Sequence, residues 1–147
     1  MNNIIKASLI IVILFQSCSP KISEIINNVP EANDRSYGYE ASNAIRIGYY
    51  NDMKKNIEAI YYYLDHLKTK SGTRLNIIGQ ALVEDPINNI EKSSLPLRFE
   101  PNITSGFLDL MISVVEGTQD TLLLYFDTFH SDTLKTPQNL FFDKQTE

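Results

Sequence analysis

The chain has 147 residues and a formal net charge of −5, from 13 basic and 18 acidic residues. This length suits a single domain. The negative charge disfavours a nucleic-acid partner, because phosphate binding relies on clustered Lys and Arg, and it equally disfavours electrostatic attachment to an anionic bilayer. Cys18 is the only cysteine, which excludes an intrachain disulfide.

The first 17 residues have the layout of a secretory signal. Lys6 is the one charged residue among them, and an apolar stretch interrupted only by Ser8 runs from Ala7 to Phe15. A membrane-spanning helix needs ~20 apolar residues, and this stretch is much shorter. We therefore expect residues 1–17 to be a signal peptide rather than a transmembrane anchor.

The end of this segment resembles the lipobox of bacterial lipoproteins, an aliphatic residue and two small residues before Cys. The match is Phe15-Gln16-Ser17-Cys18, in which Phe15 and Gln16 depart from the strict pattern in the manner usual for Bacteroidetes. The resemblance implies lipid attachment at the Cys18 sulfur, cleavage before Cys18 and acylation of the new amine. Several acyl chains on one residue give a stable membrane anchor. An ordinary signal peptide with a chance Cys is the alternative.

The residues after Cys18 bear on localisation. Ser19 stands where inner-membrane retention requires Asp in the lipoprotein family, so the expected location is the outer membrane. The acidic run that marks surface export is not evident, and the side of the membrane stays open. Residues 18–36 are predicted to be a flexible tether, with one helical turn near Ile22, and residues 37–147 a single domain.

The spacing of apolar residues predicts a helix over residues 52–69. Asn51 or Asp52 can cap its start, and Gly72 suits its end. One helical face carries six residues at helical spacing: Met53, Ile57, Ile60, Tyr61, Leu64 and Lys68.

Short extended runs surround this helix. Strands are predicted at 44–48 and 76–83, and a hairpin at 107–116 and 121–129 with its turn at 117–120. Residues 85–106 read as a long loop containing an edge segment at 95–99, and 140–142 should dock on the core. The expected fold is α+β, with one long amphipathic helix packed on a small, mainly antiparallel sheet. Two sets of apolar residues share a face in the hairpin: Leu108, Leu110, Ile112 and Val114; Leu122, Leu124 and Phe126.

From Tyr37 to Phe142 the order of motifs resembles a family of small, uncharacterised Bacteroidetes lipoproteins. The matching pieces run from Tyr-Gly-Tyr at 37–39 and Ile-Arg-Ile-Gly at 45–48 through the hairpin to Pro137 and the Phe pair at 141–142. Ala44 replaces the family's Pro, and the paired Cys of some members is missing. Members are sometimes labelled 2-dehydro-3-deoxyphosphooctonate aldolase. That enzyme resembles a (β/α)₈ barrel, which needs ~250 residues, so the activity is not carried over.

Two carboxylates are the candidates for chemistry. Asp109 and Asp127 are expected to share a face across the hairpin, and two close carboxylates can perform acid–base work. The alternative is a half-exposed sheet face with scattered charges. His130 follows Asp127 by three residues and would make a metal pair with it, but alternation along a continuing strand places the two on opposite faces. His66 reads as a boundary residue of the helix.

Other residues are candidates for binding or modification. Tyr49, Tyr50 and the run at 61–63 form an aromatic group, either a partner surface or plain packing, with Tyr61 in the core and Tyr62 and Tyr63 half exposed. Thr133, in Asp-Thr-Leu, resembles the Bacteroidetes O-glycosylation motif and should lie in a loop.

The sequence contains no Gly-rich phosphate loop, nucleophile elbow or Cys/His cluster. It therefore implies neither a cofactor nor a metal. The leading hypothesis is a non-enzymatic envelope lipoprotein that binds a protein or glycan partner, blocks a toxin as an immunity-type protein, or serves structurally. The alternative is a small envelope hydrolase that uses Asp109 and Asp127.

Overall fold

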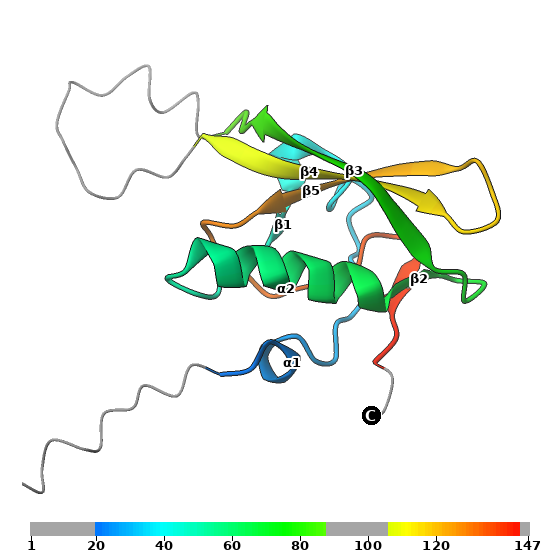
Figure 1. Ribbon diagram of the computed structural model, residues 1–147, viewed down its shortest axis with the longest axis horizontal. Helices are drawn as coiled ribbons and strands as arrows, with labels where there is room; N and C mark the ends of the chain where they lie inside the picture. The colour runs from blue at the N-terminus through cyan, green and yellow to red at the C-terminus, as the bar shows by residue number, and fades with distance from the viewer. Residues whose placement is uncertain (1–19, 88–105, 145–147) are drawn as a thin grey trace, which may run out of the picture.

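A computed structural model describes residues 20–87 and 106–144, and shows a mixed α/β fold (Figure 1). Its elements follow in chain order: α1 (Ile22–Ile25), the 3₁₀ turn η2 (Ala41–Asn43), β1 (Ile45–Arg46), α2 (Met53–His66), β2 (Leu67–Thr69), β3 (Leu75–Glu84), β4 (Phe107–Val115), β5 (Thr121–Asp127) and β6 (Leu140–Phe142).

Four strands form the main sheet, in the order β1-β5-β4-β3. β5 pairs antiparallel with β4, and β4 pairs antiparallel with β3. β1 pairs parallel with β5, with Ile45 opposite Phe126 and Arg46 opposite Asp127. β2 and β6 form a separate antiparallel pair near the end of α2 (Figure 1). The strands predicted at 44–48 and 76–83, the hairpin and the docking of 140–142 are confirmed, but the second hairpin strand ends at Asp127 and not at the predicted residue 129.

Helix α2 packs against one face of this sheet. Asp52 caps it, because its side chain accepts a hydrogen bond from the Lys54 backbone N–H at 3.0 Å. The helix ends at His66, three residues before the predicted end. Residues 67–69 form β2 instead, because the backbone of β6 satisfies their hydrogen bonds and Leu67 becomes fully buried.

The buried face of α2 is rotated from the predicted one. Tyr63 is fully buried, whereas Tyr61 is 42% exposed, so the predicted places of both are wrong. The reason is Asn56, whose amide donates to the carbonyl oxygens of Tyr50 and Thr128 at 2.8 and 2.9 Å. These bonds hold a polar residue on the face of α2 that points to the sheet. A prediction from the spacing of apolar residues does not include such a residue. The inward face comprises Asn56, Ala59, Ile60, Tyr63 and Leu64.

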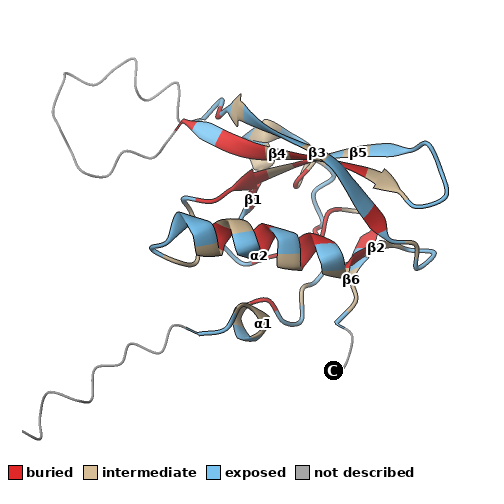
Figure 2. Ribbon diagram, viewed as in Figure 1, coloured by how far each residue is buried: buried red, intermediate tan, exposed pale blue. Residues whose placement is uncertain are grey.

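The inward face of β4 also differs from the apolar pattern. Met111 and Ser113 are fully buried beneath α2 and pair with Leu124 and Leu122 of β5. The four apolar residues from Leu108 to Val114 share a face as predicted, but that face is turned away from α2. A ribbon coloured by burial shows how much of β3 stays exposed at the edge (Figure 2).

The segment before Tyr37 belongs largely to the domain. Ile26, next to α1, is fully buried, and Ala32 is 4% exposed. The Ala32 N–H donates to Thr136 O, and the Thr136 N–H donates to Pro30 O, both at 2.8 Å. The predicted tether is therefore too long, because apolar residues within it reach the core. The helical turn at Ile22 is confirmed.

Some predictions lie outside the described residues: the signal peptide, Cys18 and the segment at 95–99. Among the residues that the structure describes, no helix is both long and apolar enough to cross a bilayer.

Candidate functional site

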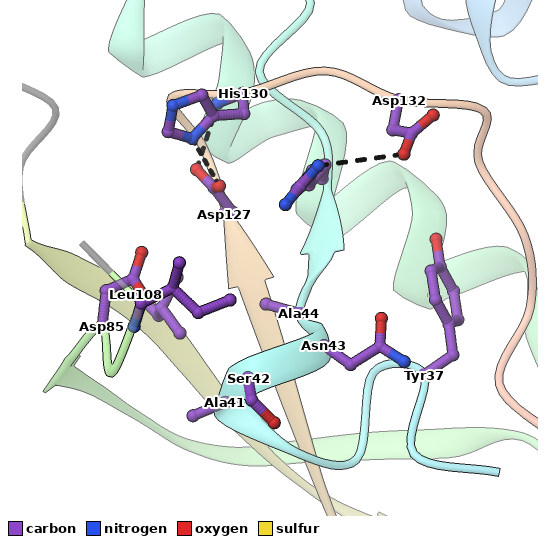
Figure 3. A pocket seen from close by; sticks show the side chains of 12 residues that line it. Tyr37, Ala41, Ser42, Asn43, Ala44, Asp85, Leu108, Asp127, His130 and Asp132 are labelled. Atoms are coloured by element: carbon purple, nitrogen blue, oxygen red, sulfur yellow. Dashed lines mark hydrogen bonds and ion pairs between the residues drawn. The ribbon is translucent and has the colours of Figure 1, made fainter. Parts of the chain in front are cut away.

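A polar pocket of about 250 Å³ lies at the end of β5, beside β1, on the sheet face turned away from α2 (Figure 3). β1 and β5 contribute Arg46 and Asp127, and the chain after β5 contributes His130 and Asp132. Pockets for drug-sized ligands run to roughly 300–1,000 Å³, so this one suits a smaller group. The remaining lining comes from Tyr37, η2 with the residue after it, and the ends of β3 and β4: Ala41, Ser42, Asn43, Ala44, Asp85, Ile87 and Leu108.

Asp127 and His130 form a direct pair in this pocket. The Asp127 Oδ1 atom accepts the backbone N–H groups of Phe129 and His130, at 2.9 and 3.1 Å. These bonds reverse the chain directly after β5 and bring His130 Nδ1 to 2.6 Å from Asp127 Oδ2. The expectation that the two side chains point to opposite faces is wrong, because the strand ends at Asp127 and alternation ends with it.

β1 holds this turn in place through its backbone. The Ile47 N–H donates to Asp127 O at 2.9 Å, and the Gly48 N–H donates to His130 O at 2.8 Å. At Gly48 a Cβ atom would lie 2.7 Å from the carbonyl carbon of Phe129 and the carbonyl oxygen of Thr128. Only a residue without a side chain allows this close approach, so Gly48 fixes the distance between β1 and the His130 turn.

The contact between Asp127 and His130 uses only the Nδ1 atom of the imidazole, so Nε2 can face a ligand. A carboxylate beside Nδ1 favours the tautomer that carries its proton there. The other nitrogen, Nε2, is then the acceptor, on a side chain that is 39% exposed. Asp127 is almost fully buried, so the pair is anchored on the protein side and open on the pocket side. This arrangement can accept a hydrogen bond or a proton from a bound group.

Arg46 adds a positive charge to the pocket. Its Nη1 lies 3.9 Å from Asp132 Oδ2, and both side chains are about half exposed or more. Such a contact stabilises the fold little, so the guanidinium can turn to a ligand. The Tyr49 hydroxyl donates to Asp132 O at 2.8 Å and steadies this loop.

Two tyrosines near the pocket stay neutral under physiological conditions. Burial is the main cause that raises the pKa of Tyr37, which lines the pocket. Burial, followed by repulsion from Tyr37 and Asp132, raises the pKa of Tyr49 to about 12. Each hydroxyl therefore keeps its proton, and Tyr37 can offer a ligand a neutral hydrogen-bond donor.

Asp109 is not part of this site. It lies directly opposite Phe126 in the β4–β5 pair, whereas Asp127 is the next residue along β5. Neighbouring strand residues point to opposite faces, so Asp109 points to the α2 side and Asp127 away from it. The expectation that they share a face is therefore wrong, and Asp109 is buried.

The other candidates are dispersed over the domain. His66 is half buried, stacks on Phe142 and makes a tilted ring contact with Tyr62, at 5.3 and 4.3 Å between ring centroids, which fits its predicted boundary role. Thr133 is exposed in a loop, as predicted. Within residues 20–87 and 106–144, no three His, Cys, Asp or Glu side chains converge in a way that could hold a metal ion.

Aromatic side chains at the start and along the length of α2 serve separate contacts. The Tyr50 hydroxyl donates to Pro20 O at 2.9 Å, and the Tyr61 hydroxyl donates to Gln80 Oε1 at 3.0 Å. The Tyr63 hydroxyl donates to Lys135 O at 2.7 Å inside the domain. These hydroxyls point to different segments, so the tyrosines do not form one surface.

Comparison with protein-family models, curated proteins and solved structures gives no match to this chain. The function must therefore be argued from the site itself.

Sequence reasoning missed most of the pocket. Asn43 and Arg46 lie close together in the chain but far from Asp85 and from the segment after β5, and nothing in their local pattern marks them as site residues. The closeness of Asp127, His130 and Asp132 in sequence was the one available signal. Interpreting it correctly required knowing that β5 ends at Asp127.

Proposed function

We propose that this chain is a lipid-anchored protein of the bacterial outer membrane whose domain is a non-enzymatic binding module for a small, hydroxyl-rich ligand such as the end of a glycan. Its scaffold would be the expected α+β arrangement, with the amphipathic helix α2 on a mainly antiparallel sheet. The anchor is proposed from the lipobox-like motif that ends in Cys18.

The observation that carries the binding proposal is the mixture of acceptors and donors around one small pocket. Asp127 and Asp132 supply carboxylates, Arg46 supplies N–H donors, and Tyr37 supplies a neutral hydroxyl. Sugar hydroxyls both donate and accept hydrogen bonds, so they match such a mixture better than a purely anionic or cationic ligand does. Leu108 and the Tyr37 ring offer apolar contact to the C–H face of a sugar ring.

The Asp127–His130 pair would fix the orientation of the ligand. With Nδ1 held by Asp127, His130 Nε2 presents a single acceptor in a defined direction. Arg46, opposite Asp127 on β1, presents donors from the neighbouring strand. A preorganised pair of this kind lowers the ordering cost of binding.

A screen of saccharides tests this proposal. The full chain, reconstituted in zwitterionic nanodiscs, would be titrated with mono- and disaccharides, including N-acetylglucosamine, galactose and mannose, and read by saturation-transfer NMR. We expect saturable binding of at least one sugar, weakened tenfold or more in Arg46→Met and His130→Phe. Asp120→Asn, in the β4–β5 turn, is the control. Absence of binding across the panel, or binding unaffected by both pocket variants, would exclude this function.

One observation favours a second candidate, a small hydrolase. An Asp–His pair with an open Nε2 is also the arrangement of a general base that activates water. This enzyme would use Asp127 and His130 rather than Asp109 and Asp127. Turnover of a bound saccharide that is lost in His130→Gln, while its binding is retained, would favour the enzyme. Binding without turnover in the unaltered chain would favour the module.

A further inference from the structure

A second concavity lies on the opposite face of the sheet, between α2 and the strands β3 and β4. It has a volume of about 410 Å³ and is separate from the polar pocket, because none of its lining residues is shared with that pocket. Its apolar walls come from α2, from the facing strands and from the turn after β5: Met53, Ile57, Leu82, Phe107 and Phe129.

Several of these apolar side chains are exposed. Leu82 is 70% exposed and Phe107 is 50% exposed, and Met53 and Phe129 are exposed as well. Single exposed apolar residues are ordinary on protein surfaces, but a group that gathers around one concavity marks a binding site. The exposed edge strand β3, which carries Leu82, is visible in Figure 2.

A carboxylate lies in this apolar groove. Asp109 is 6% exposed, and its Oδ1 and Oδ2 accept hydrogen bonds from Gln80 Nε2 at 3.0 Å and Thr128 Oγ1 at 3.4 Å. Both donors are neutral, and the ion pairs found among the described residues do not include Asp109. A buried carboxylate without a cation is costly, so a positively charged group in the groove would be stabilised by it.

We propose that this groove binds a small amphiphilic ammonium ion, with its apolar chain along Leu82, Phe107 and Met53 and its N–H groups donating to Asp109. The carboxylate selects the charge of the ligand: a fatty acid would be repelled, and a neutral chain would leave Asp109 without a counter-ion. The apolar walls select the chain, since a hydrophilic polyamine would gain nothing from them. The groove and the polar pocket lie on opposite faces of the sheet and share no lining residue.

Three six-carbon probes of matched length test the proposal: hexylammonium, hexan-1-ol and hexanoate. Each would be titrated calorimetrically into the full chain in zwitterionic nanodiscs, with heats from empty nanodiscs subtracted. We expect hexylammonium to bind in one-to-one ratio, hexan-1-ol at least tenfold more weakly, and hexanoate not at all. Equal affinity for hexylammonium and hexan-1-ol would overturn the proposal, as would the absence of saturable hexylammonium binding.

Two variants separate the charge from the apolar wall. Asp109→Asn keeps the side-chain shape, and should weaken hexylammonium at least tenfold while leaving hexan-1-ol unchanged. Asp120→Asn is its control. Leu82→Ser removes a side chain that is 70% exposed, and should weaken both probes several-fold, whereas Leu123→Ser, in β5 on the face turned away from α2, should weaken neither. Unchanged hexylammonium binding in Asp109→Asn or in Leu82→Ser would refute the placement of the ligand.

Discussion

The side-chain amide of Asn56 in α2 donates to the carbonyl oxygen of Thr128, 72 residues later, at 2.9 Å in the buried core. The same side chain also donates to Tyr50 O, and its Oδ1 accepts the Tyr50 N–H at 2.9 Å. One polar residue therefore joins the helix, the segment before it and the turn after β5. The Thr128 hydroxyl also donates to Asp109, and the backbone N–H groups of Phe129 and His130 donate to Asp127. The turn after β5 therefore contacts the carboxylates of both proposed sites.

Asn56→Ala should destabilise the fold by about 2–4 kcal/mol, because it leaves the Tyr50 N–H and two carbonyl oxygens without their partner. Urea denaturation of the full chain, followed by circular dichroism, measures the change. Asn51→Ala, at an exposed position before the helix, should change stability by less than about 0.5 kcal/mol. Equal effects at the two positions would contradict the packing described for α2.

Tyr63→Phe should cost about 1–2 kcal/mol, because it removes the hydroxyl that donates to Lys135 O at 2.7 Å in the core. Tyr61→Phe removes a hydroxyl that donates to Gln80 Oε1 at the surface, and its cost should be within about 0.5 kcal/mol. Denaturant midpoints of the two variants can be compared directly. A larger loss of stability in Tyr61→Phe than in Tyr63→Phe would contradict the burial of Tyr63 and support the helix face predicted from the apolar spacing.

Gly48→Ala should destabilise the protein by about 1–3 kcal/mol, because its Cβ would meet backbone atoms of Thr128 and Phe129 that cannot move as a side chain does. It should also displace His130, and so weaken any ligand of the polar pocket. Gly79→Ala serves as control, since a Cβ there would meet only the Ile112 side chain at 3.4 Å or more. Thermal unfolding and saccharide titration together report the two effects.

Stability should depend on pH through Glu31. The Asn139 backbone N–H, and then Lys70, hold the pKa of Glu31 below its usual 4.5. A lowered pKa in the folded state adds stability above the unfolded value, and this stability is lost as pH falls through the folded value. Glu31→Gln should therefore lower the melting temperature at pH 7, and the difference should shrink as the pH falls below 4.5.

The control for Glu31 is Glu40→Gln, which removes one exposed negative charge elsewhere. Melting temperatures of both variants and the unaltered chain would be measured from about pH 7 down to about pH 3, a range that spans the titration of a carboxyl group. A Glu31→Gln difference that stays constant or grows toward low pH would contradict a lowered pKa of Glu31 in the folded state.

Labelling with radioactive palmitate in the native host tests the anchor. We expect Cys18→Ala to abolish labelling, because the Cys18 sulfur is the atom that receives the lipid. We also expect globomycin to block processing of the unaltered chain. Ser17→Ala keeps a small residue before Cys18 and should preserve labelling. Persistence of label in Cys18→Ala would remove the basis of the outer-membrane proposal.

The local sequence pattern predicted most of the helices and strands, but few of the residues that line the polar pocket. The β4–β5 hairpin and the position of β3 follow from alternating apolar runs and a turn of four residues, which depend on near neighbours. The end of α2 could not be predicted, because residues 67–69 become a strand only when 140–142 arrives to pair with them. The length of the tether could not be predicted for the same reason, since Ile26 is buried by residues distant in sequence.

The sequence by itself determined the negative charge, the signal-like N-terminus, the mixed helix-and-strand content and the two carboxylates worth testing. The tertiary structure decided which way those carboxylates point. Asp127 ends its strand and meets His130 in a polar pocket, whereas Asp109 lies under α2 in an apolar groove. The physical reason is that one residue of strand register reverses a side chain's face, and register is set by contacts across the whole fold.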